Sequence, residues 1–282
     1  MNYKIISALL ILALASLACG FSINIPPTVQ TGPEVTDPVS AAIPASTPAR
    51  LKISFGAGEL KLSPGAQGKL VDGTATYNIP DIKPQVVEND ANVEISQGNY
   101  KFQYVPTRSL KNVWDLKLGS TPMDLTISAG AYQGKMELGG LALTGLTVND
   151  GAADNELSFS SPNAAEMTIL NYETGASNIR LHGLGNANFS TMVFKGGAGN
   201  YDIDFSGGLK RDGTASITCG LGDLTLRFPA GMSVQLTLQG GLHNVNVGSG
   251  WTRNGDVFTQ DGSGPILTLL VDMSAGNLTI TD

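Results

Sequence analysis

Charged residues are scarce in this chain of 282 residues, because Asp, Glu, Lys and Arg together make up 15% of it. Disordered chains carry more charge and fewer aliphatic residues, so the composition indicates a folded protein, and its 35 glycines indicate many turns. Acidic residues outnumber basic ones by 24 to 17, which gives a net charge of −7. This balance argues against nucleic acid as a partner, because Lys and Arg contacts to phosphate supply most of that affinity.

Cysteine and histidine are almost absent, with two residues of each. Two cysteines provide no disulfide framework, and Cys219 is left without a partner once Cys19 is assigned to the leader described below. We interpret Cys219 as a small residue at a strand end, because no histidine lies near it in sequence to activate a thiol. His182 and His243 fall in different repeats, too far apart to share a metal ion. We therefore expect no cofactor and no metal site.

Catalytic signatures are missing as well. The chain contains no nucleophile elbow, no P-loop and no dinucleotide fingerprint. Asp202 and Asp204 alternate on one strand face, so a β-helix polysaccharide-active enzyme with paired carboxylates is the sharpest enzymatic alternative. Oxygen-bearing turns near Asp150 and Asp202 leave a weak calcium site open, although the pattern of a calcium-binding loop is incomplete at both. We predict that the protein is not an enzyme.

The chain does contain a glycine corner that recurs at intervals of 21, 24, 22, 23 and 21 residues. Apolar residues stand three and five positions before each corner and six positions after it, and they alternate with polar ones as in half-buried strands. Further strand–glycine–strand units lie near both ends of the folded region. The predicted corner glycines are Gly56, Gly58, Gly130, Gly151, Gly175, Gly197, Gly220, Gly241 and Gly276.

A repeat of this size cannot bury its apolar face alone, so neighbouring copies must stack. We predict an all-β fold, a single-chain stacked β-solenoid with an N-terminal β cap. An antiparallel β-sandwich or meander is the alternative, and we favour the solenoid because a meander does not fix the repeat length. Residues 50–120 are expected to form the cap domain and residues 121–282 the glycine-cornered repeat domain.

The N-terminus resembles a bacterial lipoprotein leader. Lys4 precedes an apolar stretch too short to span a bilayer, and the stretch ends in Ser16-Leu17-Ala18-Cys19, which resembles a lipobox. We predict a signal peptide over residues 1–18, a lipid on Cys19 and a Pro/Thr/Ser-rich tether over residues 19–49. The protein is then expected to be extracytoplasmic and anchored to a bacterial cell membrane.

Several short motifs resemble the toast-rack domains of the bacterial cell envelope. They are Gly56-Ala57-Gly58-Glu59-Leu60, Tyr77-Asn78-Ile79-Pro80, Trp114-Asp115-Leu116-Lys117-Leu118 and the repeated Gly-Ala-Gly corners. The family is similar to the C-terminal part of LiaF-type stress proteins and to proposed adhesins. The lipid, tether, cap and regular stack together form a display device without catalytic features. We therefore predict a non-enzymatic structural, adhesive or ligand-binding module, whose partner is a cell-wall or surface glycan or another envelope protein. The family resemblance implies an alternative, an accessory function in sensing envelope stress.

Overall fold

The structure of the chain, a computed structural model, describes residues 28–98, 105–106 and 109–281. The predicted signal peptide and Cys19 lie outside the described residues. The chain divides into two units, residues 1–31 with 101–109 and residues 32–100 with 110–282. In the first unit, β1 (Thr28–Val29) pairs in parallel with β7 (Val105–Pro106). All that follows concerns the second unit, and no helix among the described residues has the length and apolarity needed to cross a bilayer.

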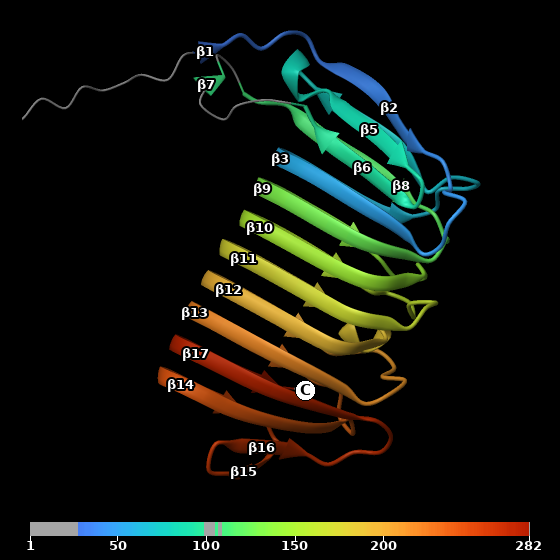
Figure 1. The fold of residues 1–282 in the computed structure, drawn as a ribbon. Helices are drawn as coiled ribbons and strands as arrows, with labels where there is room; N and C mark the ends of the chain where they lie inside the picture. Colours follow the sequence, from blue (N-terminus) through green and yellow to red (C-terminus); the bar gives the residue numbers. More distant parts are fainter. Residues whose placement is uncertain (1–27, 99–104, 107–108, 282) are drawn as a thin grey trace, which may run out of the picture. The chain divides into compact units, whose positions relative to one another are not determined.

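The second unit is built on an array of long, bent strands that lie side by side in parallel (Figure 1). Residues at like positions of the repeat are paired, so Leu146 lies between Leu125 and Leu170 on the two neighbouring strands. The parallel pairing confirms the stacked β-solenoid and excludes the antiparallel meander. In spatial order the strands are β3 (Ala49–Pro64), β9 (Met123–Glu137), β10 (Leu143–Ser158), β11 (Met167–His182), β12 (Phe189–Asp204), β13 (Gly213–Arg227), β17 (Ile266–Thr281) and β14 (Ser233–Val247).

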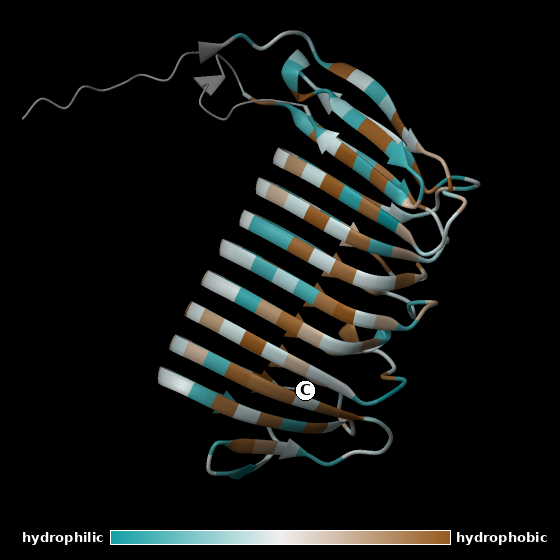
Figure 2. Cartoon of the chain, in the orientation of Figure 1, coloured by the Kyte–Doolittle hydropathy of each residue, from teal (hydrophilic) through white to brown (hydrophobic). Residues whose placement is uncertain are grey.

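Each long strand has two arms that meet at a corner, which is a glycine in all of them except β17, and apolar and polar residues alternate along both arms (Figure 2). The inward residues of the arms form the core, in which Tyr172 and Ile203 are fully buried. The two arms leave one side of the core open. The turns that follow the second arm cover that side with further aromatic residues. There the rings of Phe205 and Phe228 stack at 5.1 Å, and Trp251 meets Phe228 edge-on at 5.2 Å. Side chains from every repeat thus fill the interior.

Among the long strands, the spatial order departs from the order of the chain at one place. The C-terminal copy was expected at the far end of the array, but β17 lies between β13 and β14 (Figure 1). Ser274 of β17 therefore stands between Gly220 and Gly241 in the corner column. The segment between β14 and β17, which has no repeat pattern, forms β15 (Thr252–Asn254) and β16 (Val257–Gln260), and this hairpin pairs with the first arm of β14.

At the other end, the two arms of β3 pair with different strands. The first arm pairs with β6 (Asn92–Gln97), which is followed by β5 (Pro84–Asn89). The second arm pairs with β8 (Asn112–Leu118), followed by β4 (Val71–Tyr77) and β2 (Val35–Ala41). The range assigned to the tether thus contains a strand, because Val39 and Ala41 of β2 are buried and residues 35–41 belong to the sheet. The described residues also contain two short 3-10 helices, η1 (Pro80–Ile82) and η2 (Leu184–Asn186).

Candidate binding surface

The corner glycines stack directly on one another. A β-carbon added to Gly175 would lie 2.4 Å from the carbonyl oxygen of Gly151, and one added to Gly151 would lie 2.9 Å from that of Gly130. The same close approach recurs at Gly197 and Gly220. Glycine is therefore required at these corners because the backbone of the next strand occupies the space of a side chain.

A second corner column lies two residues further along. Gly199, Gly222 and Gly276 stand there with φ of 155°, 134° and 139°, a region that favours glycine, and Gly58 holds the same place in β3 with φ of 132°. Gly276 thus occupies this column rather than the first one. In β9 to β11 the column holds residues with buried side chains, among them Tyr132. The corners of β9, β10 and β11 consequently have room for side chains inside them.

One outward column forms a continuous row of amide and carboxylate side chains, which we call the Asx/Glx ladder. It lies three positions after the corner, and all its members except the partly exposed Glu59 are exposed. Asn200 donates to Asn178 at 2.9 Å, Asn277 donates to Asp223 at 2.6 Å, and Asn244 donates to Asn277 at 3.1 Å. The ladder comprises Glu59, Gln133, Asp154, Asn178, Asn200, Asp223, Asn277 and Asn244.

A shallow hollow of about 400 Å³ lies over the middle of this ladder. Asn178, Asn200 and Asp223 line it from the ladder, and Arg180 and Asp202 line it from the next outward column. Both of these charges are already paired, because Arg180 donates to Asp154 at 2.9 Å and Arg227 donates twice to Asp202 at 3.0 Å. The groups left to meet a ligand here are mainly amides, which both donate and accept hydrogen bonds.

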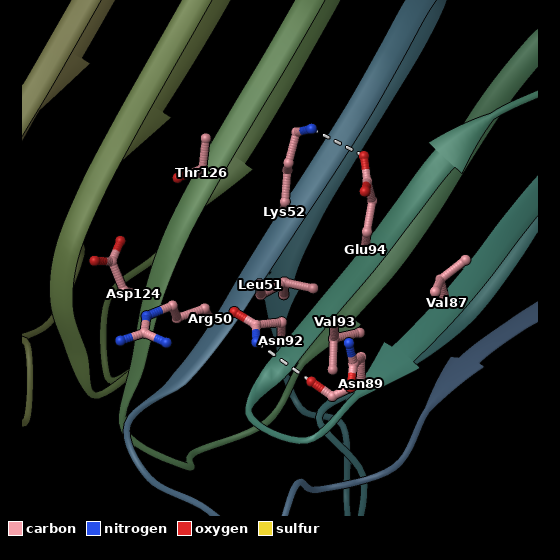
Figure 3. A pocket seen from close by; sticks show the side chains of 10 residues that line it. All are labelled: Arg50, Leu51, Lys52, Val87, Asn89, Asn92, Val93, Glu94, Asp124 and Thr126. Atoms are coloured by element: carbon pink, nitrogen blue, oxygen red, sulfur yellow. Dashed lines mark hydrogen bonds and ion pairs between the residues drawn. The ribbon is translucent and has the colours of Figure 1, made fainter.

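A second hollow, of about 470 Å³, opens on the first arms near the N-terminal end of the array (Figure 3). Lys52 of β3 and Glu94 of β6 form an ion pair across it at 2.9 Å. Arg50 lies beside its cross-strand neighbour Asp124, and Val87 of β5 stands at the far side. Opposite charges are balanced in this hollow, and such partly exposed pairs contribute little binding energy of their own.

A buried polar cluster, which the sequence did not reveal, lies inside the corners of β9, β10 and β11. Asp150 accepts hydrogen bonds from the hydroxyls of Tyr132 at 2.7 Å and Tyr172 at 2.5 Å. Asn155 donates to the same two hydroxyls at 2.9 and 2.6 Å. Burial raises the pKa of Asp150 above its usual value, although its hydrogen bonds act in the opposite direction. Asp150 was expected in a turn, but its oxygens point to tyrosines in the interior, an arrangement typical of a structural group.

The other predicted site residues are dispersed. Asp202 is paired with Arg227, whereas Asp204 accepts from the backbone and hydroxyl of Ser206 at 2.8 and 2.6 Å. His182 of β11 and His243 of β14 lie on strands separated by three others. Among the residues that the structure describes, no group of three or more His, Cys, Asp or Glu is placed to hold a metal ion.

Cys219 occupies the column immediately before the corner and is 2% exposed. Burial raises the pKa of its thiol to about 12. The thiolate is the reactive form of cysteine, so this environment is that of a structural residue. Cys219 is small and buried as expected, but it lies inside β13, beside the corner where the two arms meet, and not at a strand end.

Comparisons with known proteins point to one family. The model for the N-terminal domain of toast_rack, DUF2154, matches residues 30–169. A proposed cell adhesion protein from Clostridium sporogenes is 20% identical, and the match covers 88% of this chain and 99% of that one with a TM-score of 0.50. A proposed adhesin from Parabacteroides merdae is 11% identical, with 91% and 99% covered and a TM-score of 0.41. No curated protein matches the chain. At these identities the likeness to solved structures concerns the fold alone.

Proposed function

Because the chain belongs to the toast-rack family, we propose that it is a non-enzymatic adhesive module that binds a hydroxyl-rich glycan of the cell envelope along its Asx/Glx ladder. The ladder is the observation that carries this proposal. It presents amide and carboxylate groups on neighbouring strands spaced ~4.8 Å apart. Regular spacing of equivalent groups suits an extended polymer with a repeating unit.

The chemistry of the ladder favours a neutral glycan over other ligands. Sugar hydroxyls both donate and accept hydrogen bonds, and a carboxamide can satisfy both with one side chain. Aspartates and a glutamate in the same row oppose phosphate-rich polymers, as does the net charge of −7. The Clostridium sporogenes protein of similar fold carries the name of a proposed cell adhesion protein, which agrees with a binding function.

We propose further that the module is held outside the cell by a lipid on Cys19. The leader motif that ends at Cys19 supports this attachment. The change Cys19→Ala should release the protein from the membrane fraction, because the apolar stretch of the leader is too short to remain as an anchor. A Cys19→Ala protein that stays in the membrane fraction without a lipid would refute this attachment.

Binding to purified cell walls tests the ladder directly. The double variant Asn178→Ala, Asn200→Ala removes two adjacent amides from the hollow, and we expect it to weaken binding about tenfold, which is ~1.4 kcal/mol. The matched control is Thr191→Ala, Thr214→Ala, which removes two exposed hydroxyls from neighbouring strands on the first arm. Equal binding by the two double variants would contradict the proposed site. Release of soluble sugar from the walls would overturn the non-enzymatic proposal.

A further inference from the structure

The far end of the array is covered over only half of its last strand. The hairpin of β15 and β16 pairs with Val234–Thr237 in the first arm of β14. Leu236 beneath it is fully buried, as is Phe258 of β16. The second arm of β14 pairs with β17 on one side, and no described strand pairs with its other side. The second arm of β14 therefore ends the sheet with a free edge.

At this edge, positions whose side chains are buried in the other strands are partly exposed to solvent. Six positions after the corner, Ile203, Leu226 and Ile280 are fully buried in their strands, whereas Val247 of β14 is 38% exposed. Four positions after the corner, Leu278 is fully buried and Val245 is partly exposed. Two valines that would belong to the core of a longer array are thus left partly uncovered.

The edge also lacks the features that usually prevent pairing with another strand. Natural edge strands carry proline or charge, which block or repel an incoming chain. The other free edges follow this rule, because β2 contains Asp37 and Pro38, and β5 begins with Pro84 and contains Glu88. The exposed part of β14, Asn244-Val245-Asn246-Val247, contains neither proline nor charge.

We propose that residues 244–246, at this edge of β14, pair antiparallel with the same residues of a second copy of the chain. A two-fold axis at Val245 places Asn244 of each copy opposite Asn246 of the other on the outer face, where their amides can bond across the interface. On the inner face, the two Val245 side chains lie opposite each other, and Val247 of each copy lies diagonal to Val245 of the other. The pairing is isologous and each copy uses its edge once, so the assembly closes as a dimer.

A second copy fits this edge better than a charged partner does. Two chains that each carry a net charge of −7 repel one another, and the segment without charge is where they can approach at least cost. The dimer would also place two Asx/Glx ladders on one continuous sheet, because residues directly opposite each other in an antiparallel pair point to the same face.

Sedimentation of the full chain tests the proposal. The protein should carry Cys19→Ser, which removes both the predicted lipid site and its thiol. We expect a monomer–dimer equilibrium that Asn244→Lys with Asn246→Lys weakens about tenfold, because lysines then face each other across the axis. The matched control is Asn277→Lys with Thr279→Lys on β17, which adds the same charge in the same two columns one strand further in. The control should still dimerise.

Cross-linking tests the register independently. The change Val245→Cys places two thiols on the axis, with α-carbons ~4.5–5.5 Å apart, which is within disulfide reach. Mild oxidation should yield a disulfide-linked dimer, whereas the buried Cys219 should stay reduced. A protein that sediments as a monomer at every concentration overturns the proposal. So does a dimer that both lysine pairs weaken equally, or one that Val245→Cys does not cross-link.

Discussion

Two fully buried tyrosines should respond in opposite ways to the loss of a hydroxyl group. Tyr172 donates to Asp150 and accepts from Asn155. Tyr201, on the next strand, has a buried hydroxyl without a hydrogen-bond partner. Both rings contact Phe194, at 5.7 Å for Tyr172 and 5.1 Å for Tyr201. The changes Tyr172→Phe and Tyr201→Phe therefore keep the same aromatic packing and isolate the effect of the hydroxyl.

The expected magnitudes follow from these contacts. Tyr172→Phe removes a hydrogen bond to a buried carboxylate, an interaction that contributes ~1.5–3 kcal/mol. It also deprives Asn155 of one acceptor, so we expect the free energy of unfolding to fall by ~2–3 kcal/mol. Tyr201→Phe removes a polar group that was buried without compensation, at a cost of ~1–3 kcal/mol. We expect this variant to be more stable than the wild type by ~1 kcal/mol, because some of that cost is recovered by local adjustment.

Urea denaturation at neutral pH, followed by far-UV circular dichroism, measures both changes. The slope of the transition should be the same in all three proteins, which would show that the same surface becomes exposed. Equal losses of stability in the two variants would refute the reasoning, because they would mean that the packing of the phenol oxygen matters and its hydrogen bonds do not. A stabilising Tyr172→Phe change would refute it as well.

Two further predictions concern titration and reactivity. Burial raises the pKa of Asp150 above its ordinary value of 3.8, so the folded protein binds a proton on this carboxylate more tightly than the unfolded chain does. The energetic cost of burying the charged carboxylate is therefore relieved as the pH falls through the raised pKa. The stability of the wild type relative to Asp150→Asn should therefore increase between pH 7 and pH ~4.5 in urea titrations, and a constant difference would contradict the assignment. Ellman's reagent should label Cys219 of the Cys19→Ser protein only in denaturant, because burial raises the pKa of the thiol to about 12; rapid labelling of the native protein would show that this corner opens.

The period of the glycine corners predicted the main architecture because the physical cause is local. The corner glycines from Gly130 to Gly220 each approach the backbone of the neighbouring strand too closely for a side chain, and Ser274 of β17 is the exception in the described column. The in-register pairing of Ile203 with Leu226 follows directly from their equal distance from their corners. The insertion of β17 between β13 and β14 was not predictable in this way, because the copies resemble one another and the pattern does not encode their spatial order.

The buried polar cluster could have been found from the same alignment. Asp150 stands immediately before its corner, where other repeats hold Phe55, Ala129 and Cys219. An acid in a column of small or apolar residues indicates a polar interior at that repeat, but its partners come from three strands. Tyr172 stands three positions before its corner, in a column that is apolar in the other repeats, yet the direction of its hydroxyl depends on the corner geometry. Inward-facing side chains in the second corner column, such as that of Tyr132, complete the cluster.

The scarcity of charge in the sequence is a consequence of the parallel array. Stacking in register places each outward side chain ~4.8 Å from its equivalent on the next strand, where like charges repel. The array meets this condition with opposite charges at Glu173 and Lys195, whose nitrogen and oxygen lie 2.9 Å apart, and with amides at Asn178 and Asn200. Amides are the polar groups that can be repeated without repulsion and still bond to each other. A long in-register surface of this kind therefore offers a ligand chiefly hydrogen bonds, which is why the proposed function assigns a neutral polymer to it.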